Sequence, residues 1–457
     1  MQNTGRNRFP SIPSTSDEQL TMLNSVGLGF EDIISCVQGN ACVEGGLHLP
    51  DGLTEDQMVQ EWDTLMSRNS PAKKASLMGG GAYMHFIPAV VPHLAGQPGF
   101  VTAYTPYQPE LSQGTLQSLF EYQSFIVELT DMELSNCSMY DGASAAAEAM
   151  LMAHRIKHAP RILVAANVNP AYLATVRTYV EPHGIAEETV ATDETGQISQ
   201  ADLERLLAAG PCSAVLVQSP NYVGVIEDLP ALGKVVHAHD TLFVECFTEA
   251  MALGLLAYGV GTGADIVVGD GQSLGLPMSF GGPHLGVFAT LKKFNPELPG
   301  RIVGESVDTE GRQAYVMTLR AREQDIRREK ATSNICSNHA LNAITAAVYL
   351  GSVGRAGFRA LACENAAKLQ KLVQALEGSG RFSRVFKSGH VFNEMALASS
   401  LAPDELRSRL AAVPVVPPLA LPRGTVPEVA GMPYSYLVCA TELLKDALLE
   451  QVVAALM

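Results

Sequence analysis

The chain has 457 residues, 47% apolar and 17% charged, which predicts a globular protein with a large interior and two or three structural units. Its net charge of −16, from 31 basic and 47 acidic residues, disfavours nucleic acid and anionic membranes as general partners. Its eight cysteines lack the two-residue spacing of zinc or redox motifs, which indicates free thiols in a reducing compartment.

The first residues are polar and include Pro10 and Pro13, so we expect no secretory signal. No apolar run approaches the roughly 18 residues of a membrane span. A cytoplasmic location is the expectation that follows.

Residues 1–65 are predicted to form an N-terminal arm with short helices. Ser16-Asp17-Glu18-Gln19 is a capping pattern for a helix that ends near residue 25. Thr54 caps a second predicted helix, over 54–68, with Met58, Trp62 and Leu65 on one face.

Residues 66–335 are predicted to form a large α/β domain. It opens with a stretch over 78–113 that is dense in glycine, proline and aromatic residues, followed by a helix over 115–129. Short apolar runs then alternate with helical segments, which predicts a mostly parallel sheet covered by helices. The predicted strands are 161–166, 214–217, 241–246, 266–268 and 285–289, and the predicted helices are 143–157, 170–183, 203–208 and 229–239.

Residues 336–457 are predicted to form a smaller α+β domain. A helix pair over 338–350 and 357–377 precedes strands near 384–386, 391–397 and 434–440. A proline-rich turn lies at 413–422, and a helix over 443–456 ends the chain.

Small residues open the helix that begins near residue 142. Gly142, Ala143 and Ser144 would present free N–H groups and a partial positive charge, which suit a phosphate. The alternative is a capped, alanine-rich packing helix without a ligand.

A second glycine-rich region, over 263–275, follows a predicted strand, and Gly281-Gly282-Pro283-His284 lies just downstream. Ligands of open α/β sheets bind at the carboxyl ends of the strands, so this turn is a candidate site. A tight turn without a ligand is the alternative.

Five segments carry long motifs: Gly81-Ala82-Tyr83 with Ile87-Pro88-Ala89-Val90-Val91; Tyr104-Thr105-Pro106-Tyr107-Gln108-Pro109-Glu110; Ser138-Met139-Tyr140-Asp141-Gly142; Gly281-Gly282-Pro283-His284-Leu285-Gly286; and the run that begins Arg322-Glu323-Gln324-Asp325-Ile326-Arg327-Arg328-Glu329-Lys330. Over nearly its whole length the chain resembles the P-protein (glycine dehydrogenase, decarboxylating) family. The resemblance implies a pyridoxal-phosphate transferase fold of type I. Many bacteria split this family into two homologous subunits, and the length and motifs resemble subunit 1.

A pyridoxal enzyme needs a lysine that forms a Schiff base with the cofactor. The fold implied by the resemblance places this lysine after the strand near 265–275. No lysine occurs between Lys234 and Lys292, and Gln272, whose amide cannot form a Schiff base, stands in the turn. We therefore expect pyridoxal 5'-phosphate on the partner subunit. A self-sufficient enzyme that uses Lys292, Lys293 or Lys330 is the alternative.

The resemblance implies that this chain pairs with a cofactor-carrying subunit 2, as a heterodimer or an α2β2 heterotetramer. Together they would decarboxylate glycine and transfer the aminomethyl group to lipoamide of the H-protein, and this chain alone would be inactive. A purely structural partner subunit is a further alternative.

Two groups of residues are candidates for a role in such a complex. His85, Tyr104, Tyr107, Gln108 and Glu110 could complete the shared active site, or their segment could only pack the interface. A locally basic run could dock the acidic carrier protein or form an internally paired surface. Its cations are Arg322, Arg327, Arg328 and Lys330.

Overall fold

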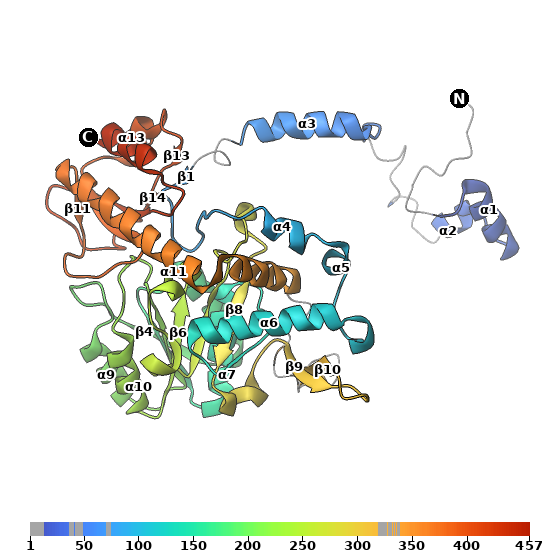
Figure 1. Ribbon diagram of the computed structural model, residues 1–457, viewed down its shortest axis with the longest axis horizontal. Helices are drawn as coiled ribbons and strands as arrows, with labels where there is room; N and C mark the ends of the chain where they lie inside the picture. Colours follow the sequence, from blue (N-terminus) through green and yellow to red (C-terminus); the bar gives the residue numbers. More distant parts are fainter. Residues whose placement is uncertain are drawn as a thin grey trace. The chain divides into compact units, whose positions relative to one another are not determined.

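The computed structural model describes residues 13–35, 41, 49–69, 75–318, 327, 331, 333, 335 and 339–457. The chain divides into two compact units, Met1–Asn69 and Ser70–Met457. The first unit contains the helices α1 (Ser16–Ser25), α2 (Phe30–Ile34) and α3 (Glu55–Ser67) (Figure 1).

Capping boxes begin two helices of the first unit. Thr54 caps α3 as predicted, and its side chain accepts a hydrogen bond from the Gln57 N–H group. Helix α1 is capped by Thr15, one residue before the predicted capping pattern. Neither α1 nor α3 buries a residue, and Met58, Trp62 and Leu65 of α3 are all exposed.

The second unit is built on a seven-stranded sheet in the order β2-β8-β7-β6-β5-β3-β4. Strands β3 to β7 pair in parallel, whereas β8 is antiparallel to β7 and to β2. The strands are β2 (Leu134–Ser135), β3 (Arg161–Ala165), β4 (Ala186–Val190), β5 (Ala214–Gln218), β6 (Leu242–Phe247), β7 (Ile266–Asp270) and β8 (Gly286–Thr290). The predicted mostly parallel α/β sheet is confirmed.

Burial explains the composition of these strands. Every residue of β3, β5, β6, β7 and β8 is buried, as in sheets that helices cover on both faces. The helices of this part are α6 (Gln113–Thr130), α7 (Gly142–Lys157), α8 (Pro170–Val180), α9 (Gln200–Ala208) and α10 (Leu229–His237). Side chains of these strands and helices form one large hydrophobic core.

A smaller antiparallel sheet, in the order β11-β12-β15-β14, has a second hydrophobic core. Its elements are β11 (Phe382–Arg384), β12 (Glu394–Ser399), α12 (Pro403–Leu410), β14 (Leu419–Ala420), β15 (Tyr434–Cys439) and α13 (Asp446–Leu456). Strand β1 (Ala75–Ser76) pairs in parallel with β13 (Val415–Val416), and Leu77 packs into the second core. Residues 75–77 therefore pack against the carboxyl-terminal part of the chain.

Helix α11 (Ala340–Gly378) runs between the two sheets in sequence and packs into both cores. We predicted two helices here, and α11 consists of two helical stretches that meet at a kink at Gly354, whose φ of 65° and ψ of 169° are not helical. Glycine adopts such a positive φ without a steric penalty, so one stretch ends there and the other begins.

Shorter elements fill the connections. They are α4 (Val90–Ala95), α5 (Pro98–Val101), the antiparallel hairpin β9 (Ile302–Val307) and β10 (Gln313–Thr318), and the 3₁₀ turns η3 (Pro109–Leu111), η4 (Glu181–His183), η5 (Ala250–Gly254), η6 (Gly259–Thr262), η7 (Ser279–Gly281) and η8 (Lys292–Glu297). Among the described residues, no helix has the length and apolar character needed to cross a membrane.

Candidate functional site

Buried polar side chains gather where the parallel strands end. Asn169 follows β3, Gln218 ends β5, Thr248 and Glu249 follow β6, and Gln272 follows β7; all are buried. The carboxyl ends of parallel strands lie at one edge of a sheet, which is the usual ligand-binding edge of this fold class. The glycine-rich turn predicted as a candidate site therefore lies among further polar groups.

The segment 79–86 crosses this edge and connects it to the small sheet. Gly80 donates its N–H to the Glu394 carboxylate of β12 (2.9 Å) and accepts a hydrogen bond from Asn169 Nδ2 (2.9 Å). Gly81 has φ of +117°, and a Cβ there would lie 2.8 Å from Asn169 Nδ2. The two glycines therefore permit a close approach that other residues would not.

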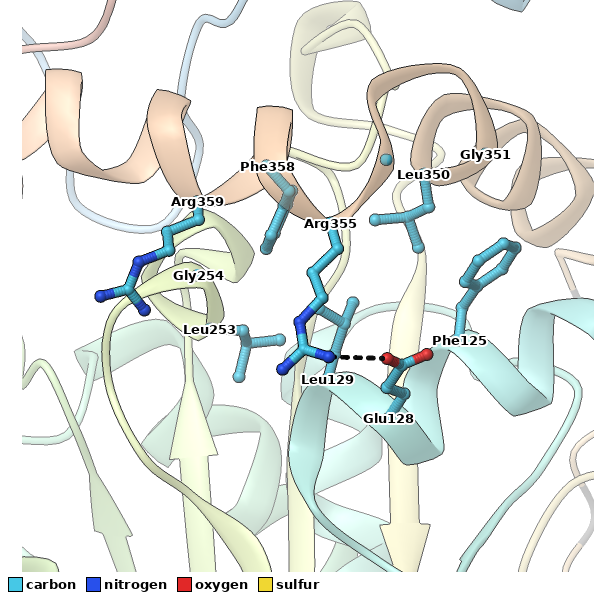
Figure 2. Close-up of a pocket in the computed structure, with 11 residues that line it drawn as sticks. Phe125, Glu128, Leu129, Leu253, Gly254, Leu350, Gly351, Arg355, Phe358 and Arg359 are labelled. Atoms are coloured by element: carbon cyan, nitrogen blue, oxygen red, sulfur yellow. Dashed lines mark ion pairs between the residues drawn. The ribbon is translucent and has the colours of Figure 1, made fainter.

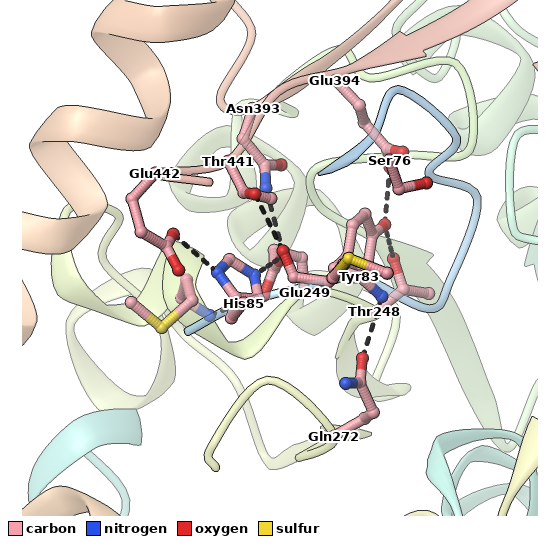
Figure 3. Close-up of polar contacts among 12 residues, drawn as sticks. Ser76, Tyr83, His85, Thr248, Glu249, Gln272, Asn393, Glu394, Thr441 and Glu442 are labelled. Carbon is pink, nitrogen blue, oxygen red and sulfur yellow. Dashed lines mark hydrogen bonds and ion pairs between the residues drawn. The ribbon is translucent and has the colours of Figure 1, made fainter. Parts of the chain in front are cut away.

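Gln272 is fixed by hydrogen bonds at both ends of its amide. Its Oε1 accepts a hydrogen bond from the Tyr83 N–H group (2.8 Å), and its Nε2 donates to the Leu276 carbonyl (2.8 Å). The side chain is 2% exposed and holds the segment 79–86 against the end of β7 (Figure 3). In the turn after β7, this residue therefore makes a structural contact.

His85 lies between two carboxylates. Its Nε2 is 2.9 Å from Glu249 Oε2, and its Nδ1 is 2.9 Å from Glu442 Oε2 (Figure 3). Since both ring nitrogens face acceptors, both must carry hydrogen, and the ring is an imidazolium. Burial alone would lower the pKa of His85, but the charges and hydrogen bonds of Glu249 and Glu442 outweigh it and raise this pKa to about 10.

The carboxylates around His85 bind further groups. Glu249 also accepts hydrogen bonds from Asn393 Nδ2 (3.0 Å) and from the Met251 N–H group (3.0 Å). Glu442 accepts one from the Phe86 N–H group (2.6 Å). Burial raises the pKa of Glu442, yet hydrogen bonding and the charge of His85 reverse the shift, so its pKa is lowered.

Tyr83 and Glu394 form the second half of this polar cluster. The Tyr83 hydroxyl donates to Glu394 Oε1 (2.7 Å) and lies 3.1 Å from Thr248 Oγ1. Burial raises the pKa of Glu394 to about 7, although the bonds from Gly80 and Tyr83 oppose the shift. Burial also raises the pKa of the Tyr83 hydroxyl. Every one of these groups contacts another protein group, which is typical of a clamp between elements.

At the amino end of α7, two carboxylates accept hydrogen bonds from backbone N–H groups. The Gly142 N–H group donates to Asp270 Oδ2 (3.1 Å), and the Ser144 N–H group donates to Asp141 Oδ1 (2.7 Å). A Cβ at Gly142 would lie 2.1 Å from the buried Tyr172 hydroxyl. Asp141 and Asp270 thus occupy two of the N–H groups that a phosphate would use, and Asp270 also lies 3.4 Å from His284 Nδ1. The degenerate phosphate site at Gly142, Ala143 and Ser144 stays a prediction.

The aromatic segment 104–110 lies apart from the polar cluster. Tyr104 is 74% exposed, and Gln108 and Glu110 are exposed too. The Tyr107 hydroxyl accepts a hydrogen bond from Arg301 Nη2 (3.0 Å), and the guanidinium lies over its ring. Of the five site-completing candidates, the structure therefore brings only His85 into the buried cluster.

The alternative lysines lie in other places. Lys292 and Lys293 are exposed beyond the end of β8, where Thr290 pairs with Ile266 at the start of β7. They are thus at the edge of the sheet opposite to the carboxyl ends of the parallel strands, and Lys293 pairs with Asp265 (3.5 Å). Of the basic run, Arg327 is exposed, whereas Arg322, Arg328 and Lys330 lie outside the described residues.

Comparison with known proteins decides the family. Residues 9–412 match the family model described as glycine cleavage system P-protein. A probable glycine dehydrogenase (decarboxylating) subunit 1 of Desulforamulus reducens is 44% identical, over 94% of this chain and 95% of the relative. The chain belongs to the glycine cleavage system P-protein family. A subunit 1 relative from Thermotoga petrophila is 40% identical over 98% of this chain and 99% of its own length.

Solved structures agree with membership of the P-protein family. A crystal structure of glycine decarboxylase (P-protein) in inhibitor-bound form superposes with a TM-score of 0.86, at 39% identity, over 98% of this chain and 99% of that one. A glutamate decarboxylase from Lactobacillus brevis has a TM-score of 0.66 at 13% identity, over 92% and 95% of the two chains. The second likeness shows the fold alone, which is the predicted pyridoxal-phosphate transferase fold of type I.

Sequence reasoning missed most of the acids in the site of this P-protein family member. Glu249, Glu394 and Glu442 come from three distant parts of the chain, and each has buried apolar neighbours. Acidic residues next to buried strands are rarely left unpaired, so Glu394 at the start of β12 and Glu249 after β6 were the available signals. Their common partners, His85 and Tyr83, could not be paired with them without the fold.

Proposed function

We propose that this chain is the subunit of glycine decarboxylase that does not hold the cofactor. With a subunit 2 that carries pyridoxal 5'-phosphate, it supports decarboxylation of glycine and transfer of the aminomethyl group to lipoamide of the H-protein. The names of its P-protein relatives, which call them subunit 1, support a two-subunit enzyme.

The observation that carries the proposal is Gln272 and its surroundings. An amide held at both ends replaces the amine that a Schiff base requires. The residues present do not fit pyridoxal phosphate in two further respects. Asp270 and Asp141 accept hydrogen bonds from N–H groups that a phosphate would need, and the segment 79–86 lies across the edge of the sheet. We therefore assign no reaction step to a cofactor on this chain.

An exposed apolar surface supports a partner subunit. The segment 86–111 exposes several large apolar side chains, and contiguous surfaces of this kind mark protein interfaces. They are Phe86, Val90, Leu94, Val101, Tyr104, Tyr107 and Leu111. We assign subunit 2 to this surface, so that Tyr104, Tyr107, Gln108 and Glu110 would face the partner's active site.

The segment is anchored well enough to position such groups. Gln113 Nε2 donates to the Pro109 carbonyl (2.8 Å) and to the Tyr315 carbonyl of β10 (2.9 Å). Gln113 also accepts a hydrogen bond from the Tyr315 N–H group (2.9 Å). A loop held against a strand in this way orients side chains at little entropic cost. The carrier-docking role of Arg322, Arg327, Arg328 and Lys330 remains part of the proposal.

Reconstitution tests the division of labour. Each subunit alone, and the two together, are assayed for carbon dioxide release from carboxyl-labelled glycine in the presence of lipoylated H-protein. Borohydride reduction followed by peptide mapping locates the cofactor. We expect activity only from the pair, with the cofactor trapped on subunit 2. Full activity from this chain alone, or a cofactor trapped on its Lys292, Lys293 or Lys330, would overturn the proposal.

Substitutions in the reconstituted complex test the aromatic segment. Tyr107→Phe and Glu110→Gln are compared with Glu405→Gln on α12, which pairs only with Arg409 in the part of the chain described. We expect lower turnover for the two segment variants at unchanged assembly, and normal turnover for the control. Unchanged turnover in all three, with intact complexes, would favour a purely structural subunit.

A further inference from the structure

A pocket of about 480 Å³ opens between α6, η5 and α11 (Figure 2). Phe125 and Leu129 of α6, Leu253 of η5, and Leu350 and Phe358 of α11 supply apolar walls. Leu253, Leu350 and Phe358 belong to the large hydrophobic core, so the pocket reaches the interior of the protein. Its volume lies within the roughly 300–1,000 Å³ of small-molecule sites.

Two glycines shape the walls of this pocket. Gly354 breaks the geometry of α11 at the mouth, and a Cβ there would meet nothing within 4 Å. Gly254 brings η5 close to α11, since a Cβ on it would lie 2.8 Å from the Ala362 Cβ and 3.2 Å from the Phe358 carbonyl oxygen. The pocket therefore follows from backbone geometry and packed core residues.

The charge at the mouth is positive, although the protein carries −16 overall. Arg355 and Arg359 lie one helical turn apart on α11 and both line the pocket. The Arg355 side chain extends toward Glu128, and that of Arg359 extends past Gly254 (Figure 2). Arg355 is 95% exposed and reaches Glu128 at 4.0 Å, which makes a weak ion pair. Arg359 has no ion pair with any described residue.

We propose that this pocket binds an amphipathic organic anion, with an apolar chain or ring inside and a carboxylate or phosphate group at the mouth. The apolar walls favour an apolar body, because its burial removes both surfaces from water. Arg355 and Arg359 favour an anionic head group, since guanidinium groups form charge-assisted hydrogen bonds with carboxylates and phosphates. A cationic head group would be repelled, and a polar ligand without an apolar body would leave the walls exposed.

Binding to the full-length chain is measured by titration calorimetry with four probes of equal chain length. Decanoate and decyl phosphate are the anions, and decanol and decyltrimethylammonium are the neutral and cationic controls, all below their micellar concentrations. We expect one anion bound per chain, weaker binding of decanol, and no binding of the cation. The two anions distinguish a carboxylate from a phosphate head group.

Two variants separate the contribution of charge from that of shape. The double variant Arg355→Gln/Arg359→Gln should weaken anion binding about tenfold or more, because charge-assisted hydrogen bonds are lost. Leu129→Trp should fill the pocket and abolish the binding of all probes. The control Arg407→Gln/Arg409→Gln removes the same charge from α12 and should bind as the natural chain does. If Leu129→Trp fails to fold, the double arginine variant still decides the role of charge.

Three results would overturn the proposal. They are the absence of anion binding, equal binding of the cation, and unchanged affinity in the double arginine variant. The titration is repeated on the reconstituted two-subunit complex. Equal affinity there supports the proposal, whereas loss of binding on assembly would overturn it, because the partner subunit would then cover the pocket.

Discussion

The segments 79–86 and 104–110 are close in sequence, and each combines tyrosine with turn-forming glycine or proline, yet they differ in burial and in their partners. The first is mostly half-buried, with Tyr83 fully buried, and is held by Gln272, Glu394 and Glu442. The second is largely exposed, and its Tyr107 bonds to Arg301 at the surface. The difference shows that polar and aromatic loop residues act either as a clamp or as a contact surface, according to the partners that distant segments supply.

Among the variants that test this difference, replacement of His85 should cause the largest loss of unfolding free energy. His85→Gln leaves the buried Glu249 and Glu442 without a cation, and breaking a buried ion pair in this way costs about 3–5 kcal/mol of unfolding free energy. Urea unfolding of the full chain measures the loss. Glu110→Gln, in the exposed segment, is the control and should change stability by no more than about 0.5 kcal/mol. Equal stability of the two variants would contradict the clamp.

Loss of one hydroxyl should have an intermediate effect. Tyr83→Phe removes the donor to Glu394 and leaves a buried carboxyl oxygen without it, which should cost about 1–3 kcal/mol. The same substitution at the exposed Tyr107 removes a bond to the half-buried Arg301 and should cost about 0.5 kcal/mol or less. Thermal or urea unfolding of the two matched variants measures both values, and a larger loss for Tyr107→Phe would reverse the assignment.

The pH dependence of stability should show the His85 imidazolium directly. Its pKa is about 10 in the folded chain and near 6.5 when unfolded, so the folded state holds the extra proton between these values. Stability from this group is complete below pH 6.5 and falls as the pH rises toward 10, by up to about 1.4 kcal/mol per pH unit. Unfolding of the natural chain and of His85→Gln at pH 7, 8 and 9 measures the two slopes. Parallel slopes would contradict the charged histidine.

Glu394 should change the stability of the protein over a lower pH range than His85 does. Its pKa is about 7 in the folded chain and 4.5 when unfolded, so the folded carboxyl keeps a proton that the unfolded one has lost. Its contribution to stability is complete below pH 4.5 and decreases as the pH rises toward 7. Glu394→Gln should flatten the curve between pH 5 and 7 relative to the natural chain. An unchanged curve in this window would show that Glu394 ionises normally.

Much of the fold could be predicted because its signals are local. The five predicted strands of the large sheet lie within two residues of β3, β5, β6, β7 and β8, since buried apolar runs mark such strands. Strand β4 and the hairpin β9–β10 were missed because their residues are mostly polar or half-exposed. The predicted helix pair is confirmed, since two helical stretches of α11 meet at a kink at Gly354.

The sequence by itself determined the family, the parallel sheet and the absence of a lysine around Gln272, because each depends on the order of residues along the chain. Only the tertiary structure decided what the Gln272 amide contacts. Gln272 binds the backbone of Tyr83. His85 lies between Glu249, which follows β6, and Glu442, which follows β15. These contacts join residues far apart in sequence, and only packing of the two sheets brings them within hydrogen-bonding distance.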